Sequence, residues 1–222
     1  MQPSIGRRTA VILRVAVSLA VLAVAAPGGA AIKELANDSF TGMGSVSCQV
    51  GFIEGESAAV KLTADPGDYP YQITKVRMLV CPASSLGYVI LRISEDNTGT
   101  VLPGPVLYEE IVQVTGSDIA LNEVDLTASN LFIASGSVRV ELEWFQNSPP
   151  GAGHDLDGFV ANANYIYAWV NPPGIWGWFY ADQLGVLGDW IIRMEIETGA
   201  ERPIFADGFE SGNTLEWTLT VP

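Results

Sequence analysis

Short runs of β-branched and aromatic residues, separated by turn signals, follow one another from Val46 to about Thr198. Such runs favour β-strands, and no helical period of comparable length interrupts them. They predict strands at residues 46–53, 58–64, 71–81, 88–94, 106–114, 121–126, 138–145, 159–170, 177–182 and 190–196. Pro, Gly, Asp and Asn cluster in the gaps and supply the backbone angles that sharp reversals need. About ten short strands without crossover helices predict an all-β fold, an antiparallel jelly-roll-like β-sandwich.

Apolar and charged side chains alternate in the strand predicted at residues 138–145. The apolar set is Val138, Val140, Leu142 and Trp144, and the charged set is Arg139, Glu141 and Glu143. Because successive strand residues point to opposite faces, we expect the first set to be buried and the second to face solvent.

Four stretches resemble the β-sandwich domains of poorly characterised secreted bacterial proteins. They are "ITKVRMLVC", "YVILRISEDNTGTVLPGPVLYEEI", "VRVELEWF" and "GVLGDWIIRMEI". In those domains, as in this sequence, an Asp/Asn/Gly turn and a Pro-Gly-Pro follow a strong strand. The resemblance rests on turn chemistry, so it implies the fold and no activity.

The N-terminus is typical of a secretory signal peptide, which we place at residues 1–31. Arginines at positions 7, 8 and 14 form a basic region, and an uncharged apolar run covers residues 15–26. This run is shorter than the roughly 20 apolar residues of a membrane-spanning helix, so no stable membrane insertion is expected after cleavage. Cleavage after Ala25, Ala30 or Ala31 fits the small residues, and the last two are favoured. The paired arginines leave twin-arginine export open beside the general secretory route.

The charge balance restricts the partners of a secreted or cell-surface protein of this kind. The chain has 25 Asp and Glu against 11 Lys and Arg, a net charge of −14, and loss of the leader removes three of those arginines. Such a surface repels nucleic acid and anionic membranes. It is compatible with solubility, with divalent cations and with neutral partners such as glycans.

Cys48 and Cys81 are the only cysteines. An even count in an exported chain predicts one disulfide, and neither residue has a Cys or His neighbour that would favour a metal or redox site. The predicted bridge is structural and would stabilise the fold by about 3 to 4 kcal/mol in the chain-entropy model.

Glu141 and Glu143, in "VELEWFQ", resemble the Glu-x-Asp-x-x-Glu strand of jelly-roll glycoside hydrolases. Two positions along a strand are about 6.6 Å apart, close to the carboxyl separations of about 5 to 9.5 Å in such enzymes. However, Glu143 stands where that pattern has Asp, and Gln146 stands near the third acid. A solvated strand face is therefore the alternative to a catalytic pair.

Asp155 and Asp157 stand two residues apart, directly before Gly158. This pattern favours a calcium loop, because Ca²⁺ binds carboxylate oxygens at alternate positions and the glycine permits the chain to bend. Asp96 or Asn97 could complete the ligand shell if the turns converge. Calcium is the one cofactor that the sequence suggests, and the alternative is an acidic turn. His154, beside this segment, is expected to be an exposed loop residue that serves no hydrolytic triad.

An aromatic stretch, "NYIYAWVNPPGIWGWFYADQLG", surrounds an Asn-Pro-Pro-Gly turn. Exposed rings stack on sugars, and Trp176 and Trp178 share one strand face as a possible ligand platform. Tyr165, Tyr167 and Trp169 also share a face, so one interpretation puts one set in the core and the other on the surface. Burial of both sets is the alternative.

The sequence divides into four parts: the signal peptide, an extended lead-in at 32–45, the sandwich domain at 46–200, and a linker and tail at 201–222. The tail reads "DGFESGNTLEW" from Asp207 to Trp217. Its characteristic residues are Asp207, Gly208, Phe209, Glu210, Ser211, Gly212 and Trp217. It resembles an ending found on many otherwise unrelated secreted bacterial proteins, which implies a portable tail for sorting or surface handling. An edge strand at 215–221 is the alternative.

These features favour a secreted, non-enzymatic binding or surface module, with a glycan or another surface protein as partner and with calcium as a stabilising ion. Two alternatives stay open. One is a jelly-roll glycoside hydrolase that uses Glu141 and Glu143, and the other is a purely structural protein of the envelope or matrix.

Overall fold

The computed structural model describes residues 30–42, 46–146 and 150–199. Residues 1–29 of the expected signal peptide and the whole tail motif lie outside these ranges. The described chain is all-β, with 53% of residues in strands that pair antiparallel, as the sequence predicts. None of its helices is long and apolar enough to cross a membrane, in the part of the chain that the structure describes.

Fourteen strands and three short 3₁₀ helices make up the described chain. The strands are β1 (Ala31–Leu35), β2 (Val46–Gln49), β3 (Ser57–Thr63), β4 (Tyr71–Met78), β5 (Val80–Cys81), β6 (Leu86–Glu95), β7 (Val106–Thr115), β8 (Asn122–Asp125), β9 (Leu131–Ile133), β10 (Ser137–Trp144), β11 (Gly151–Asp155), β12 (Asn164–Val170), β13 (Ile175–Tyr180) and β14 (Ile192–Thr198). The 3₁₀ helices are η1 (Pro66–Asp68), η2 (Thr127–Ser129) and η3 (Ala181–Leu184).

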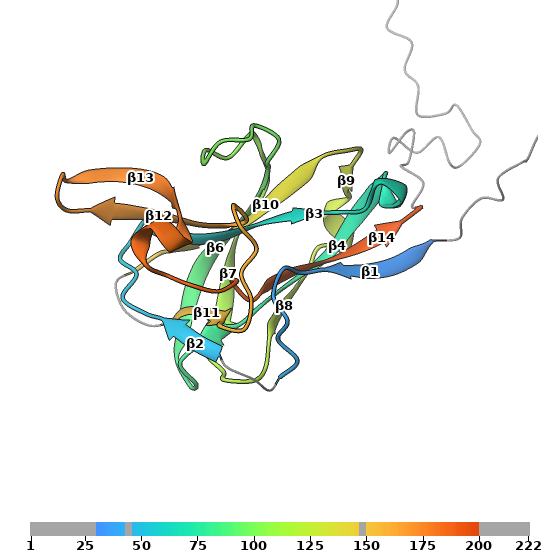
Figure 1. Cartoon of the computed structure of the whole chain (residues 1–222). Coiled ribbons are helices and arrows are strands. Elements are labelled where there is room, and N and C mark those ends of the chain that lie inside the picture. Colours follow the sequence, from blue (N-terminus) through green and yellow to red (C-terminus); the bar gives the residue numbers. More distant parts are fainter. Residues whose placement is uncertain (1–29, 43–45, 147–149, 200–222) are drawn as a thin grey trace, which may run out of the picture.

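The strands form two larger sheets and one small one (Figure 1). The first sheet has the order β1-β14-β4-β8, and β9 pairs with β4 beyond the end of β8. The second sheet has six strands in the order β13-β12-β3-β10-β6-β7. The third sheet, β2-β11-β5, lies at one end of the sandwich.

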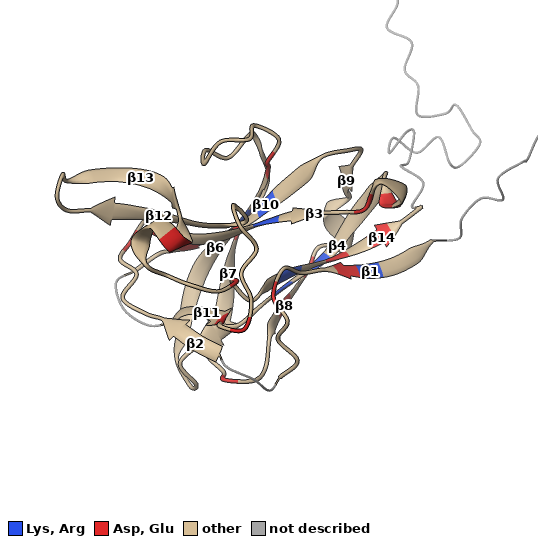
Figure 2. Ribbon diagram, in the orientation of Figure 1, with Lys and Arg blue, Asp and Glu red and all other residues tan. Residues whose placement is uncertain are grey.

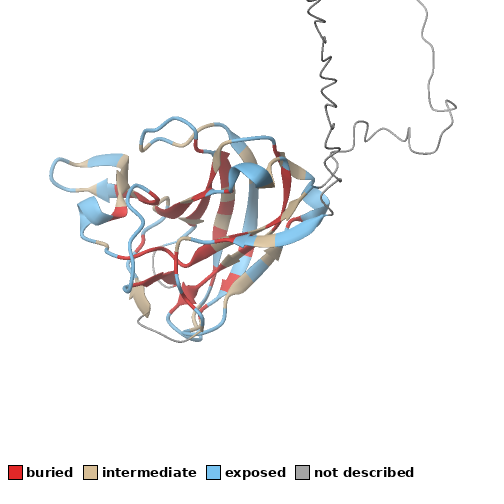
Figure 3. Ribbon diagram, turned by 45° about the vertical axis from the view of Figure 1, so that its right-hand side comes forward, coloured by how far each residue is buried: buried red, intermediate tan, exposed pale blue. Residues whose placement is uncertain are grey.

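The two larger sheets pack their apolar faces together to form the core. Alternate residues of each strand contribute, among them Val60 and Leu62 of β3, Val76 and Met78 of β4, Leu91 and Ile93 of β6, Val140 and Leu142 of β10, and Ile192 and Met194 of β14. Figure 3 shows the buried positions inside the strands and the exposed ones on the loops and on the β12–β13 hairpin. The apolar set predicted for β10 is buried as expected, and its Trp144 stacks on Phe52 with ring centroids 3.9 Å apart.

Four strands go beyond the ten that the sequence predicts. The expected lead-in contributes β1, β5 is separate from β4 within the predicted run at 71–81, and β9 and β11 lie where no strand was expected. Strand β1 is mostly exposed and β11 is rich in Gly, so neither has a local strand signal. Strand β1 takes its conformation from pairing with β14, and β11 takes its conformation from pairing with β2 and β5.

The predicted disulfide between Cys48 and Cys81 is confirmed. It joins β2 to β5, two strands that both pair with β11, and the two Cα atoms are 5.9 Å apart. The bridge therefore fixes the small sheet at the end of the sandwich.

His154 lies in β11 and is buried, so the prediction of an exposed loop residue was wrong. Gly153 beside it leaves room for a neighbouring segment, since a Cβ on this glycine would lie only 2.7 Å from the Leu79 side chain. Its Nδ1 is 2.7 Å from the carbonyl oxygen of Leu187, and its ring meets Trp190 edge-on at 5.5 Å. Burial lowers the pKa of His154 below its usual value, although the contact with Leu187 acts in the opposite direction.

Acid should therefore destabilise the native protein through His154. The unfolded chain takes up a proton below about pH 6.5, whereas the folded ring resists protonation, so the free energy of unfolding falls as the pH drops. His154→Asn keeps a donor near Leu187 and removes the titration. Between pH 7.5 and 5, the free energy of unfolding measured with urea should fall by about 1 to 2 kcal/mol more for the native protein than for this variant. Parallel curves for the two proteins would contradict this.

Candidate functional site

The hairpin of β12 and β13 carries six aromatic side chains on one face of the six-stranded sheet. Antiparallel pairing sets Tyr165 opposite Tyr180, Tyr167 opposite Trp178, and Trp169 opposite Trp176. Directly opposite residues point to the same side of a sheet, so the six rings form one surface, which we call the aromatic ladder. The two sets share one face, so the interpretation that one set fills the core and the other forms the surface was wrong. Tyr165 is nevertheless buried, because the Arg139 guanidinium covers its ring. The ladder lies on the side of the sheet that faces away from the core.

A tight turn brings the two halves of the ladder together. Gly174 has a φ of +83°, and its N–H donates to the carbonyl oxygen of Val170 at 2.8 Å. The hairpin projects beyond the body of the sandwich and carries no charged residue (Figures 1 and 2). At its outer end Trp169 is 43% exposed and Trp176 is 42% exposed. The ladder is therefore open to solvent at the tip of the hairpin.

Toward the middle of the sheet the ladder borders a pocket of about 340 Å³. The residues that matter for its chemistry are Arg92, Ser94, Glu141, Glu143, Tyr167 and Trp178, and we call this the acidic pocket. Strand β3 runs between the ladder and β10. Its side chains that point outward between the tyrosines of β12 and the glutamates of β10 are the small Ser57 and Ala59. Small residues between two lines of large ones leave the sheet surface hollow.

Arg92 holds both glutamates of the pocket. Its Nη1 donates to Glu141 Oε1 at 2.8 Å and to Glu143 Oε2 at 3.0 Å, while its Nε donates to Glu109 at 2.7 Å. Ser57 Oγ donates to the same oxygen of Glu141 at 2.7 Å. Burial raises the pKa of the Glu141 carboxyl, and the hydrogen bonds from Ser57 and Arg92 act in the opposite direction.

The alternation in β10 predicts that its polar face is solvated, and this prediction was wrong for two residues. Arg139 is fully buried and Glu141 is nearly so. The Arg139 guanidinium lies 3.7 Å from the centroid of the Tyr165 ring. Its Nε and Nη2 are each 3.0 Å from Asp96 Oδ2, and its Nη1 donates to the carbonyl oxygen of Val101 at 2.8 Å. These contacts fasten the β6–β7 loop, residues 96–105, over the outer face of the sheet.

The three predicted calcium ligands serve other contacts. Asp96 binds Arg139, whereas Asp155 Oδ2 accepts from the backbone N–H of Ser39 at 2.7 Å. Asp157 Oδ1 accepts from Ser39 Oγ at 2.7 Å. Within the described ranges, no group of three or more His, Cys, Asp or Glu residues is placed to hold a metal ion. Asp155 and Asp157 thus meet at the Ser39 hydroxyl, but Asp96 does not join them.

The comparisons with known proteins add no relative. No family model matches the chain, and neither a curated protein nor a solved structure matches it. Function is therefore inferred from the geometry of the outer face.

Removal of either partner of the Arg139–Asp96 pair should destabilise the protein strongly. Both side chains are buried, so Arg139→Met leaves Asp96 without a countercharge, and Asp96→Asn leaves Arg139 without one. We expect each single variant to lower the free energy of unfolding by about 3 to 5 kcal/mol in urea titrations. The double variant should be more stable than either single one, and additive losses in the double variant would contradict the coupling.

Proposed function

We propose that this protein is a secreted, non-enzymatic module that binds a glycan on the outer face of its six-stranded sheet. The observation that supports this most is the aromatic ladder, whose rings form cross-strand pairs on one face of a hairpin that has no charged residue of its own. Sugars have apolar ring faces that pack on aromatic side chains, while their hydroxyl groups bond to polar groups placed nearby. The acidic pocket supplies such polar groups beside Tyr167 and Trp178.

The form of the ladder suits an extended chain of sugars. Along each strand, rings on one face recur about every 6.6 Å, which is on the scale of one sugar unit. Tyr167 stacks on Trp176 at 5.5 Å, so neighbouring pairs form a continuous apolar surface. Exposed apolar patches of this kind mark interaction sites, because isolated proteins gain nothing by keeping tryptophans in water.

Truncation of the exposed end of the ladder should weaken glycan binding. Trp169→Ala with Trp176→Ala removes two stacking surfaces and should reduce affinity about tenfold or more for glycans that the native protein binds on an array. Isothermal titration with a glycan found on the array measures the loss. Ile175→Ala is the matched control, since Ile175 is 48% exposed on the same hairpin and points to the opposite face. Absence of any glycan binding by the native protein would contradict the proposal and favour a structural role.

A retaining glycoside hydrolase is the second candidate. It is favoured by the position of Glu141 and Glu143, which line one pocket opposite Trp178. Both bind a single nitrogen of Arg92, so their bonded oxygens lie within about 5.8 Å of each other, near the separation of about 5 to 5.5 Å in retaining enzymes. Arg92 also argues against catalysis, because it donates to an oxygen of each carboxylate, whereas a hydrolase needs one of the two as a free proton donor. The raised pKa of Glu141 acts in the other direction and keeps this candidate open.

The two candidate functions differ in whether the protein releases sugar from the glycan. From a glycan that it binds, the native protein should release no reducing sugar over a long incubation. Glu141→Gln and Glu143→Gln should each retain measurable binding. Sugar release by the native protein that is lost in either variant would establish the hydrolase instead.

A further inference from the structure

Ser94 contributes a buried hydroxyl that has no partner. The residue is 1% exposed and lines the acidic pocket, and its Oγ makes no hydrogen bond within the part of the chain that the structure describes. Buried polar groups are nearly always paired, so an unpaired one needs an explanation. A ligand hydroxyl inside the pocket would supply the missing hydrogen bond.

The charges around the pocket favour a cationic ligand. Three carboxylates, those of Glu109, Glu141 and Glu143, share Arg92 as their countercharge, which leaves the group net negative. Arg139, whose guanidinium lies 5.0 Å from the Trp178 ring, is paired with Asp96 and adds no net charge. Sugars that carry carboxylate or sulfate groups would be repelled.

The carboxylates also keep acceptor capacity for a ligand. Arg92 and Ser57 both bind Oε1 of Glu141, and Arg92 binds Oε2 of Glu143. Among the described residues, no hydrogen bond reaches the second oxygen of either side chain. The opposite wall consists of the Tyr167 and Trp178 rings, whose centroids are 5.4 Å apart. Aromatic rings attract cations over their faces, so this wall and the carboxylates favour the same kind of group.

We infer that the acidic pocket binds an amino sugar in its protonated form, with the ammonium group between the carboxylates and the rings and a hydroxyl on Ser94. The ligand class is a glycan with free amino groups, such as a glucosamine oligomer. The pocket volume of about 340 Å³ lies in the range of small-molecule sites. This inference rests on the proposed glycan-binding function and adds the chemistry of the sugar.

Three trisaccharides with the same linkage test the inference at mildly acidic pH. They are the trimers of glucosamine, N-acetylglucosamine and glucose, titrated calorimetrically into the full mature chain. The glucosamine trimer should bind about tenfold more tightly than the two neutral trimers. Glu143→Gln should reduce this preference to about twofold, with little change in the affinity for the glucose trimer.

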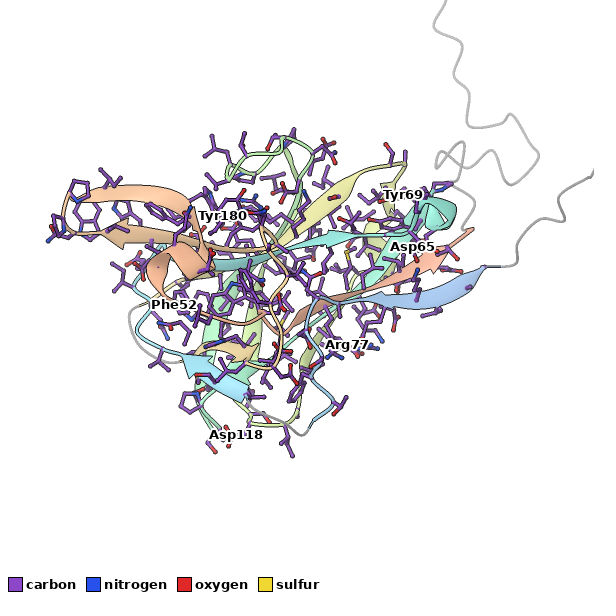
Figure 4. All side chains as sticks on the ribbon, viewed as in Figure 1. Phe52, Asp65, Tyr69, Arg77, Asp118 and Tyr180 are labelled. Carbon is purple, nitrogen blue, oxygen red and sulfur yellow. A yellow bond between two sulfur atoms is a disulfide. The ribbon has the colours of Figure 1, made fainter. Side chains whose placement is uncertain are left out.

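A charge control separates the pocket from general attraction between a cation and an acidic protein. Glu123→Gln removes one negative charge from the other main sheet, where Glu123 binds Arg77 at 3.0 Å. Figure 4 shows Arg77 away from Tyr180, which belongs to the aromatic ladder. This variant should keep the tenfold preference. An equal loss in the two variants would overturn the assignment to the pocket.

Ser94→Ala supplies an independent measurement. It should weaken binding of the glucosamine trimer about threefold to tenfold and leave the melting temperature unchanged or higher, because an unpaired buried hydroxyl is lost. A lower melting temperature with unchanged affinity would overturn the role of Ser94. Equal affinity for all three trimers would overturn the amino-sugar inference and leave the proposed function intact. Binding of none of them, together with an empty glycan array, would overturn both.

Discussion

The outer face of the six-stranded sheet depends on one buried charge, the guanidinium of Arg139. A cation removed from water must have a carboxylate and further hydrogen-bond acceptors, and Asp96 and the carbonyl oxygen of Val101 provide them. Both lie in the β6–β7 loop, so pairing draws that loop across the sheet. Pro103 of the same loop then lines the acidic pocket. Arg139 also covers the ring of Tyr165, which leaves the outer rings of the ladder as the surface that can meet a ligand.

The hairpin register provides the second half of the site. Because residues equally distant from a turn face each other, two separate aromatic runs become one ladder. The central strand β3 then decides the shape of the surface, since Ser57 and Ala59 are too small to fill the space between the ladder and β10. An apolar wall and a charged wall face each other across this hollow. These two walls match the apolar ring face and the polar hydroxyl groups of the proposed glycan ligand.

Local sequence patterns predicted the parts of the structure that depend on a single strand. The alternation around Val140 indicated the core face of β10, and the two cysteines indicated the bridge. The strand pattern did not predict that Arg139 and Glu141 would also be buried, because their cover comes from a distant loop and from β12. The single ladder could have been predicted, since Tyr167 and Trp178 lie at equal distances from the turn at 171–174. Strand β11 could not have been predicted, because its glycine-rich sequence has little strand preference and its conformation depends on pairing with β2 and β5.

The acidic residues show why type and spacing alone do not identify a ligand site. Asp155 has the spacing of a calcium ligand, but donors of the protein occupy both of its oxygens, the N–H of Ser39 on one and that of Asp189 on the other. Glu141 and Glu143 have the spacing of an ordinary strand face. Arg92 binds one oxygen of each and, among the described residues, no donor binds the other. A carboxylate whose acceptors are already filled fixes the fold, whereas one that keeps an acceptor beside a hollow can bind a partner. The acceptors that Glu141 and Glu143 keep beside the hollow therefore support the proposed binding site on the outer face.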